Sequence, residues 1–168
     1  MNFILIGFKN SGKTSIGQYI ATKTNRQFID TDYLIEEKYY IQHQKKLKTA
    51  QIYQTEGEEF FRTVESICIN NLGSVKHSII ATGGGTLLHN ENIIRLKKIG
   101  QLIYLNTSFS ILNMRKPEQP IPQQFVQEFA LRSNIYKKNA DIEINTENKS
   151  IKAIGEEIIN LMSFDVTY

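Results

Sequence analysis

A phosphate-binding motif begins at the seventh residue of this chain and constrains the fold more than any other feature. Residues 7–14 read GFKNSGKT and match the pattern G-x-x-x-x-G-K-[S/T] in full. An apolar run at 3–6 precedes the motif and a helical pattern over 13–22 follows it, which is the strand–loop–helix context that the pattern requires. Glycines let such a loop curl so that its N–H groups point at phosphate oxygens, and the helix adds its positive N-terminal end. The motif therefore predicts an α/β protein that binds a nucleotide.

The residue types in this loop suit particular tasks toward a nucleotide. Lys13 would act in catalysis by placing a compact cation on the β- and γ-phosphates, and the Thr14 hydroxyl would bind Mg²⁺. A plain turn between a strand and a helix can carry a lysine by chance, but the complete motif in its required context favours phosphate binding. We expect ATP to contact most of the loop and the residue after it: Gly7, Asn10, Ser11, Gly12, Lys13, Thr14 and Ser15.

Short apolar runs alternate with helical patterns along the rest of the chain. The runs cover residues 3–6, 27–30, 78–81, 102–105 and 141–144, and helical spacing recurs over 13–22, over 90–99 and after Ser150. Apolar runs of this length are typical of strands buried on both faces of a parallel sheet. The chain of 168 residues suits one domain, 1–168, with three layers in which helices cover both faces of the sheet. Gly100 should end the helix over 90–99, and Ser150 should cap the last helix.

Composition and charge argue against several classes of protein. Hydrophobic residues make up 40% of the chain, which argues against disorder, and no apolar run approaches the roughly 20 residues that span a bilayer. The N-terminus lacks a basic region and a cleavage site, so we expect a strand there and not a signal peptide. The single cysteine, Cys68, cannot form an internal disulfide and no Cys/His cluster indicates zinc, which fits the cytoplasm. The net charge of +3, without a basic block among aromatics, does not indicate nucleic acid as a partner.

Two carboxylates follow the second apolar run. Asp30 and Asp32 would lie at the carboxyl end of a strand, which is the edge where ligands bind in open α/β sheets. Asp30 could hold Mg²⁺ through water, and Asp32 could accept the proton of an attacking hydroxyl. Alternatively, Thr31 or Asp32 only caps a helix that begins near Tyr33. The phosphate-binding loop in the same chain favours the first interpretation.

Further motifs follow in an order and spacing that resemble the shikimate kinase family, within the nucleoside monophosphate kinase-like group. The motifs are the phosphate loop, DTD at 30–32, GEEFFRTVE at 57–65, TGGGT at 82–86, and ALRSNIY at 130–136 followed by Ala140 and Asp141. The resemblance runs from about residue 3 to residue 159. It implies a P-loop kinase with a five-stranded parallel sheet in the order 2-3-1-4-5. It also implies a substrate-binding region at about 32–62 and a short lid at about 113–125.

The resemblance implies an activity and a role for individual residues. The family transfers phosphate from ATP to the 3-hydroxyl of shikimate, with Mg²⁺, in the biosynthesis of aromatic amino acids through chorismate. By match to its motifs, Asp32 would contact the shikimate hydroxyls and Asp30 would be linked to magnesium. Arg62 and Arg132 would bind the substrate carboxylate, and Glu65 would orient the first of them. Gly83, Gly84 and Gly85 match a turn that approaches the substrate. Arg115 matches an arginine that stacks on adenine.

The residues themselves support these assignments. Shikimate carries a carboxylate, and the planar guanidinium of arginine pairs with a carboxylate through two hydrogen bonds. In a helix from Glu56 onward, Arg62 and Glu65 are three residues apart on one face, so an ion pair could fix the guanidinium. Taken alone, Arg62 would be interpreted as a solvated surface charge. Three glycines after a buried strand cost backbone entropy, and close approach to a ligand or a tight turn would explain them.

Two positions depart from the family pattern. Asn10 stands where the family usually has a further glycine, and asparagine tolerates the left-handed backbone better than most residues. Gln119, in the stretch 115–124 that holds all three prolines of the chain, stands where the family has a lid arginine that reaches the transferred phosphate. Either turnover is weak, or another cation supplies the charge: Arg115, Lys116 or Lys9.

Two other functions stay open from the sequence. A kinase for another small acceptor, such as gluconate, would use similar groups, although a nucleotide acceptor would require more lid arginines than Arg115. A non-catalytic nucleotide-binding protein would keep the phosphate loop but would not need Asp32, Arg62 and Arg132 together. The sequence favours a shikimate kinase whose partners are ATP and shikimate, with no nucleic acid or membrane. We expect a monomer, because one chain can supply all these groups.

Overall fold

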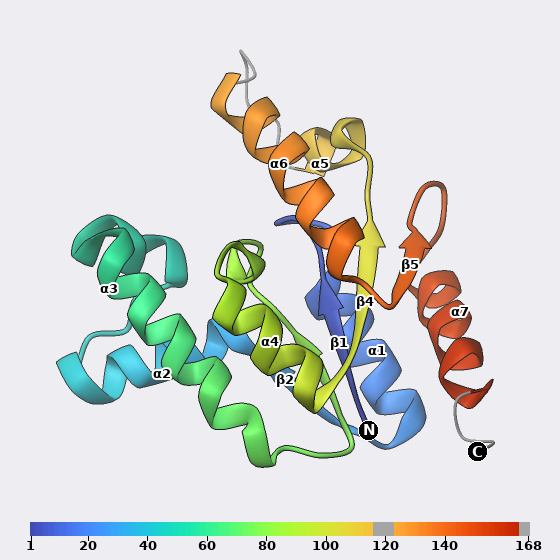
Figure 1. Ribbon diagram of the computed structural model, residues 1–168, viewed down its shortest axis with the longest axis horizontal. Coiled ribbons are helices and arrows are strands. Elements are labelled where there is room, and N and C mark those ends of the chain that lie inside the picture. Colours follow the sequence, from blue (N-terminus) through green and yellow to red (C-terminus); the bar gives the residue numbers. More distant parts are fainter. Residues whose placement is uncertain (116–122, 165–168) are drawn as a thin grey trace.

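The computed structural model describes residues 1–115 and 123–164, which form a parallel sheet with helices on both faces (Figure 1). The strands are β1 (Asn2–Ile6), β2 (Gln27–Asp30), β3 (Ser78–Ala81), β4 (Gly100–Asn106) and β5 (Ile142–Asn145). They lie in the order β2-β3-β1-β4-β5, and every neighbouring pair is parallel. The predicted three-layer α/β architecture and its strand order are confirmed.

Helices connect the strands, with two helices between β2 and β3 and two between β4 and β5. They are α1 (Lys13–Thr24), α2 (Thr31–His43), α3 (Thr49–Asn71), α4 (Asn90–Ile99), α5 (Phe109–Arg115), α6 (Gln123–Asn139) and α7 (Ile151–Phe164), with the 3₁₀ turns η1 (Leu72–Ser74) and η2 (Thr86–Leu88). The helix predicted over 90–99 has those bounds, and Ser150 caps α7 by accepting a hydrogen bond from the Ala153 nitrogen at 3.1 Å. The loop predicted at 115–124 is shorter at both ends, because Arg115 ends α5 and Gln123 begins α6. The rest of that stretch lies outside the described residues.

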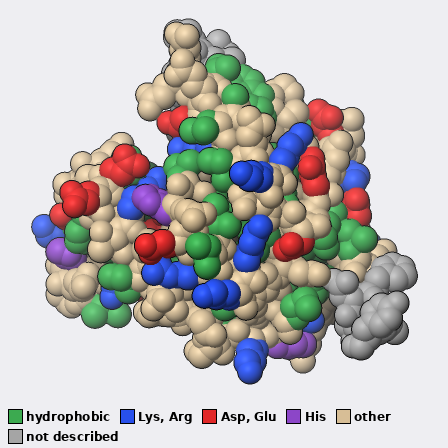
Figure 2. Space-filling view, in the orientation of Figure 1, with side chains coloured by type: hydrophobic (Ala, Val, Ile, Leu, Met, Phe, Trp, Pro, Cys, Tyr) green, Lys and Arg blue, Asp and Glu red, His purple; other side chains and the backbone are tan. Residues whose placement is uncertain are grey.

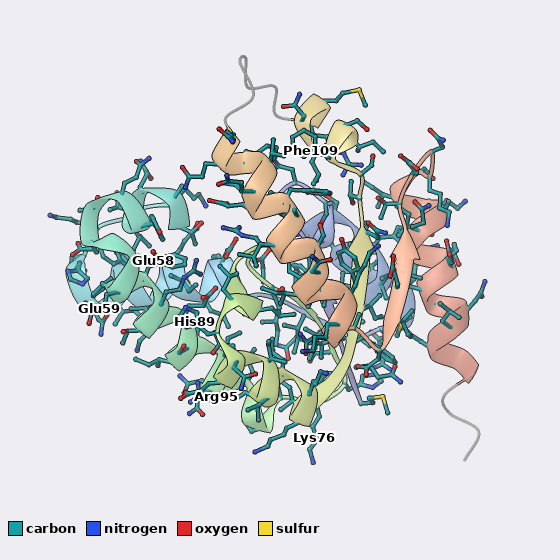
Figure 3. The ribbon with its side chains drawn as sticks, turned by 45° about the horizontal axis from the view of Figure 1, so that its top comes forward. Glu58, Glu59, Lys76, His89, Arg95 and Phe109 are labelled. Carbon is teal, nitrogen blue, oxygen red and sulfur yellow. The ribbon has the colours of Figure 1, made fainter. Side chains whose placement is uncertain are left out.

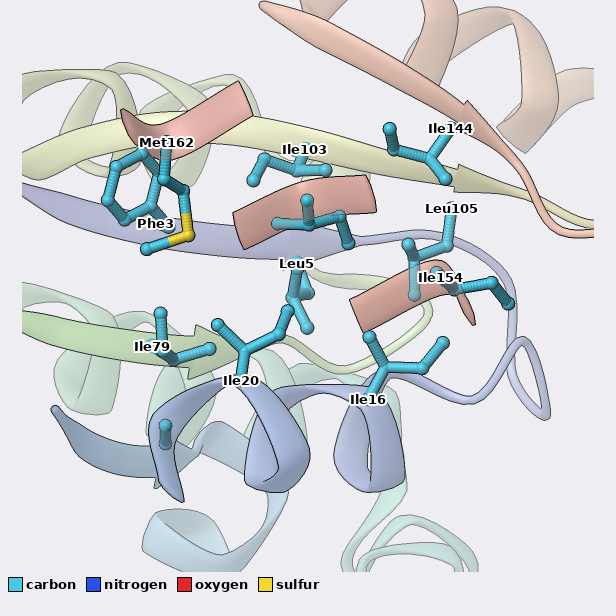
Figure 4. Packing of buried hydrophobic residues seen from close by; sticks show 12 residues of the cluster. Phe3, Leu5, Ile16, Ile20, Ile79, Ile103, Leu105, Ile144, Ile154 and Met162 are labelled. Carbon is cyan, nitrogen blue, oxygen red and sulfur yellow. The ribbon is translucent and has the colours of Figure 1, made fainter. Parts of the chain in front are cut away.

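The centre of the sheet is buried on both faces because β1, β3 and most of β4 are apolar on both sides, whereas the edge strands β2 and β5 are partly exposed. Side chains alternate along a strand, so Phe3 and Leu5 of β1 face one layer while Ile4 and Ile6 face the other. Figure 4 shows the first layer, in which α1 and α7 cover the sheet with Ile16, Ile20, Ile154 and Met162. The second layer contains residues of α3, α4, α5 and α6: Ile69, Leu96, Leu112 and Tyr136. With both faces covered, the carboxyl edge of the sheet is left to carry the loops of the site.

Helices α2 and α3 pack on each other through a separate apolar cluster that includes Ile35, Tyr39, Ile52, Val64 and Cys68. A helix was predicted from Glu56 onward, but α3 begins earlier, at Thr49. Gly57 interrupts α3 with φ 84° and ψ 172°, a conformation that glycine adopts more readily than other residues. The helical segment that carries the GEEFFRTVE motif therefore starts at this break, close to the predicted position.

The surface charges are mixed in sign. Figure 2 shows Lys and Arg side chains interspersed with Asp and Glu over the face in view, so the net charge of +3 does not gather there into one basic patch. Among the helices that the structure describes, none is long and apolar enough to cross a membrane.

Candidate active site

The phosphate loop (residues 7–14) joins β1 to α1 at the carboxyl edge of the sheet. Asn10 has φ 66° and Gly12 has φ 96°, so Asn10 adopts the left-handed conformation for which its residue type is suited. The Lys13 ammonium donates to the carbonyl oxygens of Gly7 and Phe8, each at 2.8 Å. A buried ammonium whose hydrogen-bond acceptors are neutral oxygens attracts an anion, so the loop is a favourable place for a phosphate.

Lys13 is buried and the nearby Asp32 is partly buried, and the loss of solvation moves their pKa values toward one another. Burial lowers the pKa of Lys13 to about 8, against the attraction of Asp32 and Asp30. Burial raises the pKa of Asp32 to about 6, with help from the charge of Asp30 and against the attraction of Lys13. A carboxylate with such a pKa is mostly ionised at neutral pH and still accepts a proton well, which suits a general base.

The structure brings the two predicted metal ligands together. The Thr14 hydroxyl donates to Asp30 Oδ2 at 2.8 Å. The other oxygen of Asp30 accepts a hydrogen bond from the Asp32 nitrogen at 3.0 Å and caps α2, which begins at Thr31 and not near Tyr33. The alternative that Thr31 or Asp32 provides the cap was therefore wrong, because Asp30 caps the helix while its second oxygen faces the loop.

A hydroxyl and a carboxylate fit Mg²⁺, which takes few protein ligands and keeps water or phosphate as its remaining ligands. Within residues 1–115 and 123–164, no three His, Cys, Asp or Glu residues cluster as metal ligands.

The glycine turn (residues 83–85) packs so closely against its neighbours that side chains would not fit. None of its members is among the positive-φ glycines, so left-handed backbone is not the reason for them. An added Cβ would lie 2.7–2.9 Å from a neighbour in each case: Gly83 from Asp32 Oδ1, Gly84 from the Lys9 nitrogen and Gly85 from Arg62 Nη2. The turn therefore leaves room for an aspartate, the phosphate loop and an arginine, and its predicted approach to a ligand stays a prediction.

Arg62 is fixed by the ion pair that the sequence predicts. Its Nη1 lies 2.9 Å from Glu65 Oε2, and the two side chains are 13% and 2% exposed. The guanidinium also lies over the Phe61 ring, 5.4 Å from the ring centre. Because both partners are withdrawn from water, this is not the solvated surface charge that an isolated arginine suggests.

Arg132 comes from α6, whereas Arg62 comes from α3. Its Nη1 donates to the Gly84 carbonyl at 3.4 Å, and its guanidinium lies 5.4 Å from the centre of the Phe8 ring. Its Nη2 pairs with Glu128 at 2.8 Å, four residues earlier on α6. The buried Tyr136 hydroxyl donates to the same Gly84 carbonyl, so α6 binds the centre of the glycine turn through two side chains.

These groups line one cavity of about 850 Å³, here called the site cavity. Among the predicted site residues, Gly7 alone does not line it, because Gly7 is buried at the start of the loop. Arg115 reaches the loop and donates to the Asn10 carbonyl at 2.7 Å, whereas Gln119 and Lys116 lie outside the described residues. Three carboxylates of the lining, Asp30, Asp32 and Glu65, face six cations: Lys9, Lys13, Arg62, Arg115, Arg132 and Lys149. This excess of positive charge suits a phosphate together with a second anion.

Part of the lining was not predicted. Tyr53 and Gln54 come from the first segment of α3, and Lys149 comes from the connection between β5 and α7. Phe61 adjoins Arg62 within the GEEFFRTVE motif, so its position offered a signal. Tyr53 and Gln54 fall within the predicted substrate-binding region at about 32–62, but neither was named, because their segment was not expected to be helical.

The fold and the cavity together define a class: a P-loop protein of the kinase type, whose cavity is lined by a phosphate loop and by arginines from two different helices. A family model described as shikimate kinase matches residues 9–163. This chain belongs to the shikimate kinase family.

Individual relatives agree with the family match. A shikimate kinase of Caldanaerobacter subterraneus subsp. tengcongensis is 32% identical over 166 residues, covering 94% of each chain. A shikimate kinase of Vibrio cholerae is 31% identical over 170 residues, covering 96% of this chain and 94% of that one. Among solved structures, the shikimate kinase of Acinetobacter baumannii in complex with shikimate is 28% identical with a TM-score of 0.87, covering 99% of this chain and 95% of the other. The shikimate kinase of Aquifex aeolicus is 25% identical with a TM-score of 0.86, and 99% of each chain is covered.

Proposed function

We propose that this protein transfers the γ-phosphate of ATP to the 3-hydroxyl of shikimate, giving shikimate 3-phosphate for the synthesis of chorismate and the aromatic amino acids. One observation carries the proposal: a single cavity joins the phosphate loop and Asp32 to two arginines from different helices. A substrate with one carboxylate and a hydroxyl to be phosphorylated matches that arrangement. The Acinetobacter baumannii relative, solved in complex with shikimate, supports the choice of acceptor.

At the nucleotide end, the phosphate loop would hold ATP through its backbone N–H groups and the helix end behind them. Lys13 would leave the carbonyls of Gly7 and Phe8 for the phosphates, which are stronger partners for a buried ammonium. Thr14 and Asp30 would hold Mg²⁺, which supplies positive charge to the phosphates when it is bound. The other proposed ATP contacts are Asn10, Ser11, Gly12, Ser15 and, toward the adenine, Arg115.

At the acceptor end, Arg62 and Arg132 would bind the carboxylate, and the glycine turn (83–85) would approach the ring. Asp32 would accept the proton of the 3-hydroxyl as that oxygen bonds to the γ-phosphorus. The bond between the γ-phosphorus and the bridging oxygen breaks, and the electron pair leaves with ADP. Lys13 would stabilise the charge that develops on the transferred group.

We further propose that residues 1–168 act as one domain and as a monomer, with a substrate-binding region at about 32–62 and a lid at about 113–125. All the groups named above come from one chain, which supports a monomer. Cys68 is buried and unpaired, which agrees with a reducing cytoplasm. The charge missing at Gln119 would be supplied by Arg115, Lys116 or Lys9, because a cation at the transferred phosphate is worth several powers of ten in rate.

A coupled assay of ADP release with Mg-ATP tests the activity, with shikimate, gluconate and nucleoside monophosphates compared as acceptors. We expect turnover of roughly 1 to 100 per second with shikimate, and its loss in Asp32→Asn, which keeps the shape of the side chain but not its basicity. ATP binding without turnover on any acceptor would refute the proposal, and turnover on gluconate alone would change the acceptor. Gln119→Arg tests the lid: no gain in turnover would show that the charge is already supplied.

A further inference from the structure

Arg62 lies between two hollows of the molecule. One is the site cavity, and the other is a groove of about 880 Å³ between α3 and α4, here called the α3–α4 groove. Figure 3 shows Glu58 and Glu59 on α3, with His89 and Arg95 beside them at α4, and these residues line that groove. Arg62 Nε already lies 3.6 Å from Glu58 Oε1. The groove therefore offers carboxylates that compete for the guanidinium.

Glu65 pairs with Arg62 from a buried position in the protein interior. Its carboxylate is almost completely buried, and each oxygen has one partner among the described residues. Oε2 accepts from Arg62 Nη1 at 2.9 Å, and Oε1 accepts from the Thr86 hydroxyl at 2.8 Å. A buried carboxylate keeps its orientation only while its oxygens are satisfied, so the second bond helps to decide where the first one points.

Thr86 is built to make that second bond. Its side chain is fully buried, and its hydroxyl must be the donor because an ionised carboxylate only accepts. Its backbone is fixed on both sides: the nitrogen donates to the Gly83 carbonyl at 3.3 Å, and the carbonyl accepts from Asn92 Nδ2 at 3.3 Å. Thr86 does not line the site cavity. Because the hydroxyl donates to Glu65, the effect of removing the hydroxyl alone would reach the substrate through Glu65.

We infer that Thr86 is a positioning residue for recognition of the substrate carboxylate: its hydroxyl holds Glu65 in the orientation that points Arg62 into the site cavity and away from the α3–α4 groove. The inference rests on the proposed function, because it assigns Thr86 a part in binding shikimate through Arg62.

Thr86→Val tests the hydroxyl with little change of shape, since valine has the same branching at Cβ. The variant leaves Glu65 Oε1 buried without a donor, so the carboxylate turns and Arg62 loses its fixed direction. Arg62 would bind the carboxylate equally before and during phosphate transfer, so its loss of order raises KM and leaves kcat nearly unchanged. We expect the KM and the Kd for shikimate to rise about tenfold, while the KM for ATP stays the same.

The experiment compares wild type, Thr86→Val, Thr86→Ser and a control, Thr24→Val. Serine keeps the donor, so Thr86→Ser should restore the shikimate KM to within about twofold of wild type. Thr24 donates its hydroxyl to the Ile20 carbonyl at 2.8 Å at the far end of α1, so Thr24→Val removes a comparable hydrogen bond away from the cavity. Steady-state kinetics with each substrate varied, calorimetric titration with shikimate, and thermal unfolding are measured on all four proteins.

The possible results separate this inference from the function on which it rests. If wild type neither binds nor phosphorylates shikimate, the proposed function fails and the inference fails with it. If wild type is active and Thr86→Val has an unchanged shikimate KM and Kd, the inference alone is wrong. It is also wrong if Thr86→Val lowers kcat and weakens ATP as much as shikimate, or if Thr86→Ser does not restore affinity, because those results describe general damage to the fold.

Discussion

The two arginines proposed to bind the acceptor are held in opposite ways. Arg62 pairs with Glu65, whose side chain is only 2% exposed and is bonded in turn to Thr86. Arg132, itself 19% exposed, pairs with Glu128, which is 36% exposed, and otherwise contacts a backbone carbonyl and an aromatic ring. Arg62 is thus paired with a carboxylate in the buried interior, whereas the carboxylate that pairs with Arg132 is exposed enough for water to replace it. Removal of Arg62 should therefore disturb the fold, and removal of Arg132 should disturb only the binding of the substrate.

Arg62→Ala should have the largest effect. It leaves the Glu65 carboxylate buried without its cation, which costs about 3–5 kcal/mol of unfolding free energy when a buried pair is broken. Shikimate binding should be lost as well. Urea unfolding followed by circular dichroism and calorimetric titration with shikimate measure the two effects. The double variant Arg62→Ala/Glu65→Leu is the matched control and should regain stability without regaining shikimate binding; a single variant as stable as wild type would contradict the comparison.

Arg132→Ala should weaken shikimate strongly while leaving the fold intact. Loss of a charge-assisted hydrogen bond to the carboxylate corresponds to about a 10- to 100-fold rise in the KM for shikimate. The unfolding free energy should change by less than about 1 kcal/mol, because Glu128 can be solvated once its partner is gone. Arg132→Lys should fall between wild type and alanine, since lysine keeps the charge but not the planar fork. A loss of stability as large as that of Arg62→Ala would show that the two arginines are held alike.

Two neighbouring glycines allow the comparison to be sharpened. A Cβ on Gly84 would lie 2.9 Å from the Lys9 backbone nitrogen, whereas one on Gly85 would lie 2.7 Å from the end of the Arg62 side chain. Gly84→Ala must shift backbone, so we expect it to cost about 1–3 kcal/mol of stability and to raise the KM for ATP. Gly85→Ala must displace the Arg62 guanidinium from its pair with Glu65, so we expect it to lower stability less than Arg62→Ala does, to leave the KM for ATP unchanged and to raise the KM for shikimate several-fold. Kinetics and thermal unfolding of the two variants distinguish them, and identical profiles would refute this explanation.

The parts of the site that were predictable from the sequence are those in which one short segment contains the whole arrangement. The phosphate loop needs only residues 7–14 and the strand and helix beside them, and the Arg62–Glu65 pair needs only one turn of helix. The central strands β1 and β3 and most of β4 are runs buried on both faces and were found for that reason, whereas the edge strands β2 and β5 are partly exposed and carry polar residues. Asp30 was assigned to the metal but not to the cap, since a sequence cannot show that each oxygen of one carboxylate has its own partner.

The unpredicted parts depend on contacts between segments that are distant in the sequence. Thr86 meets Glu65 across 21 residues, and Tyr136 meets Gly84 across 52. Neither separation in the sequence indicates a contact, because how close the two residues of each pair come is set by how η2 and α6 pack on the sheet. The early start of α3 was missed for a related reason: its first segment is held by packing on α2 through Ile52 and by the bond from Tyr39 to Glu56 at 2.6 Å.

Glu128→Gln should have the smallest effect. It tests most directly whether Arg132 can exchange its pair with Glu128 for a pair with the substrate. In the free protein Glu128 occupies Arg132 and so competes with the substrate carboxylate for the same guanidinium. Neutralising it should lower the Kd for shikimate about twofold at low salt, and the gain should shrink as salt screens the exposed pair. Glu58→Gln is the matched control: Glu58 is also four residues before its arginine, but it is 63% exposed and lies 3.6 Å from Arg62. Because Glu65 already fixes Arg62, Glu58→Gln should leave the Kd unchanged. Equal gains in both variants, measured by calorimetric titration at two salt concentrations, would mean that the buried Glu65–Thr86 pair does not distinguish the two arginines.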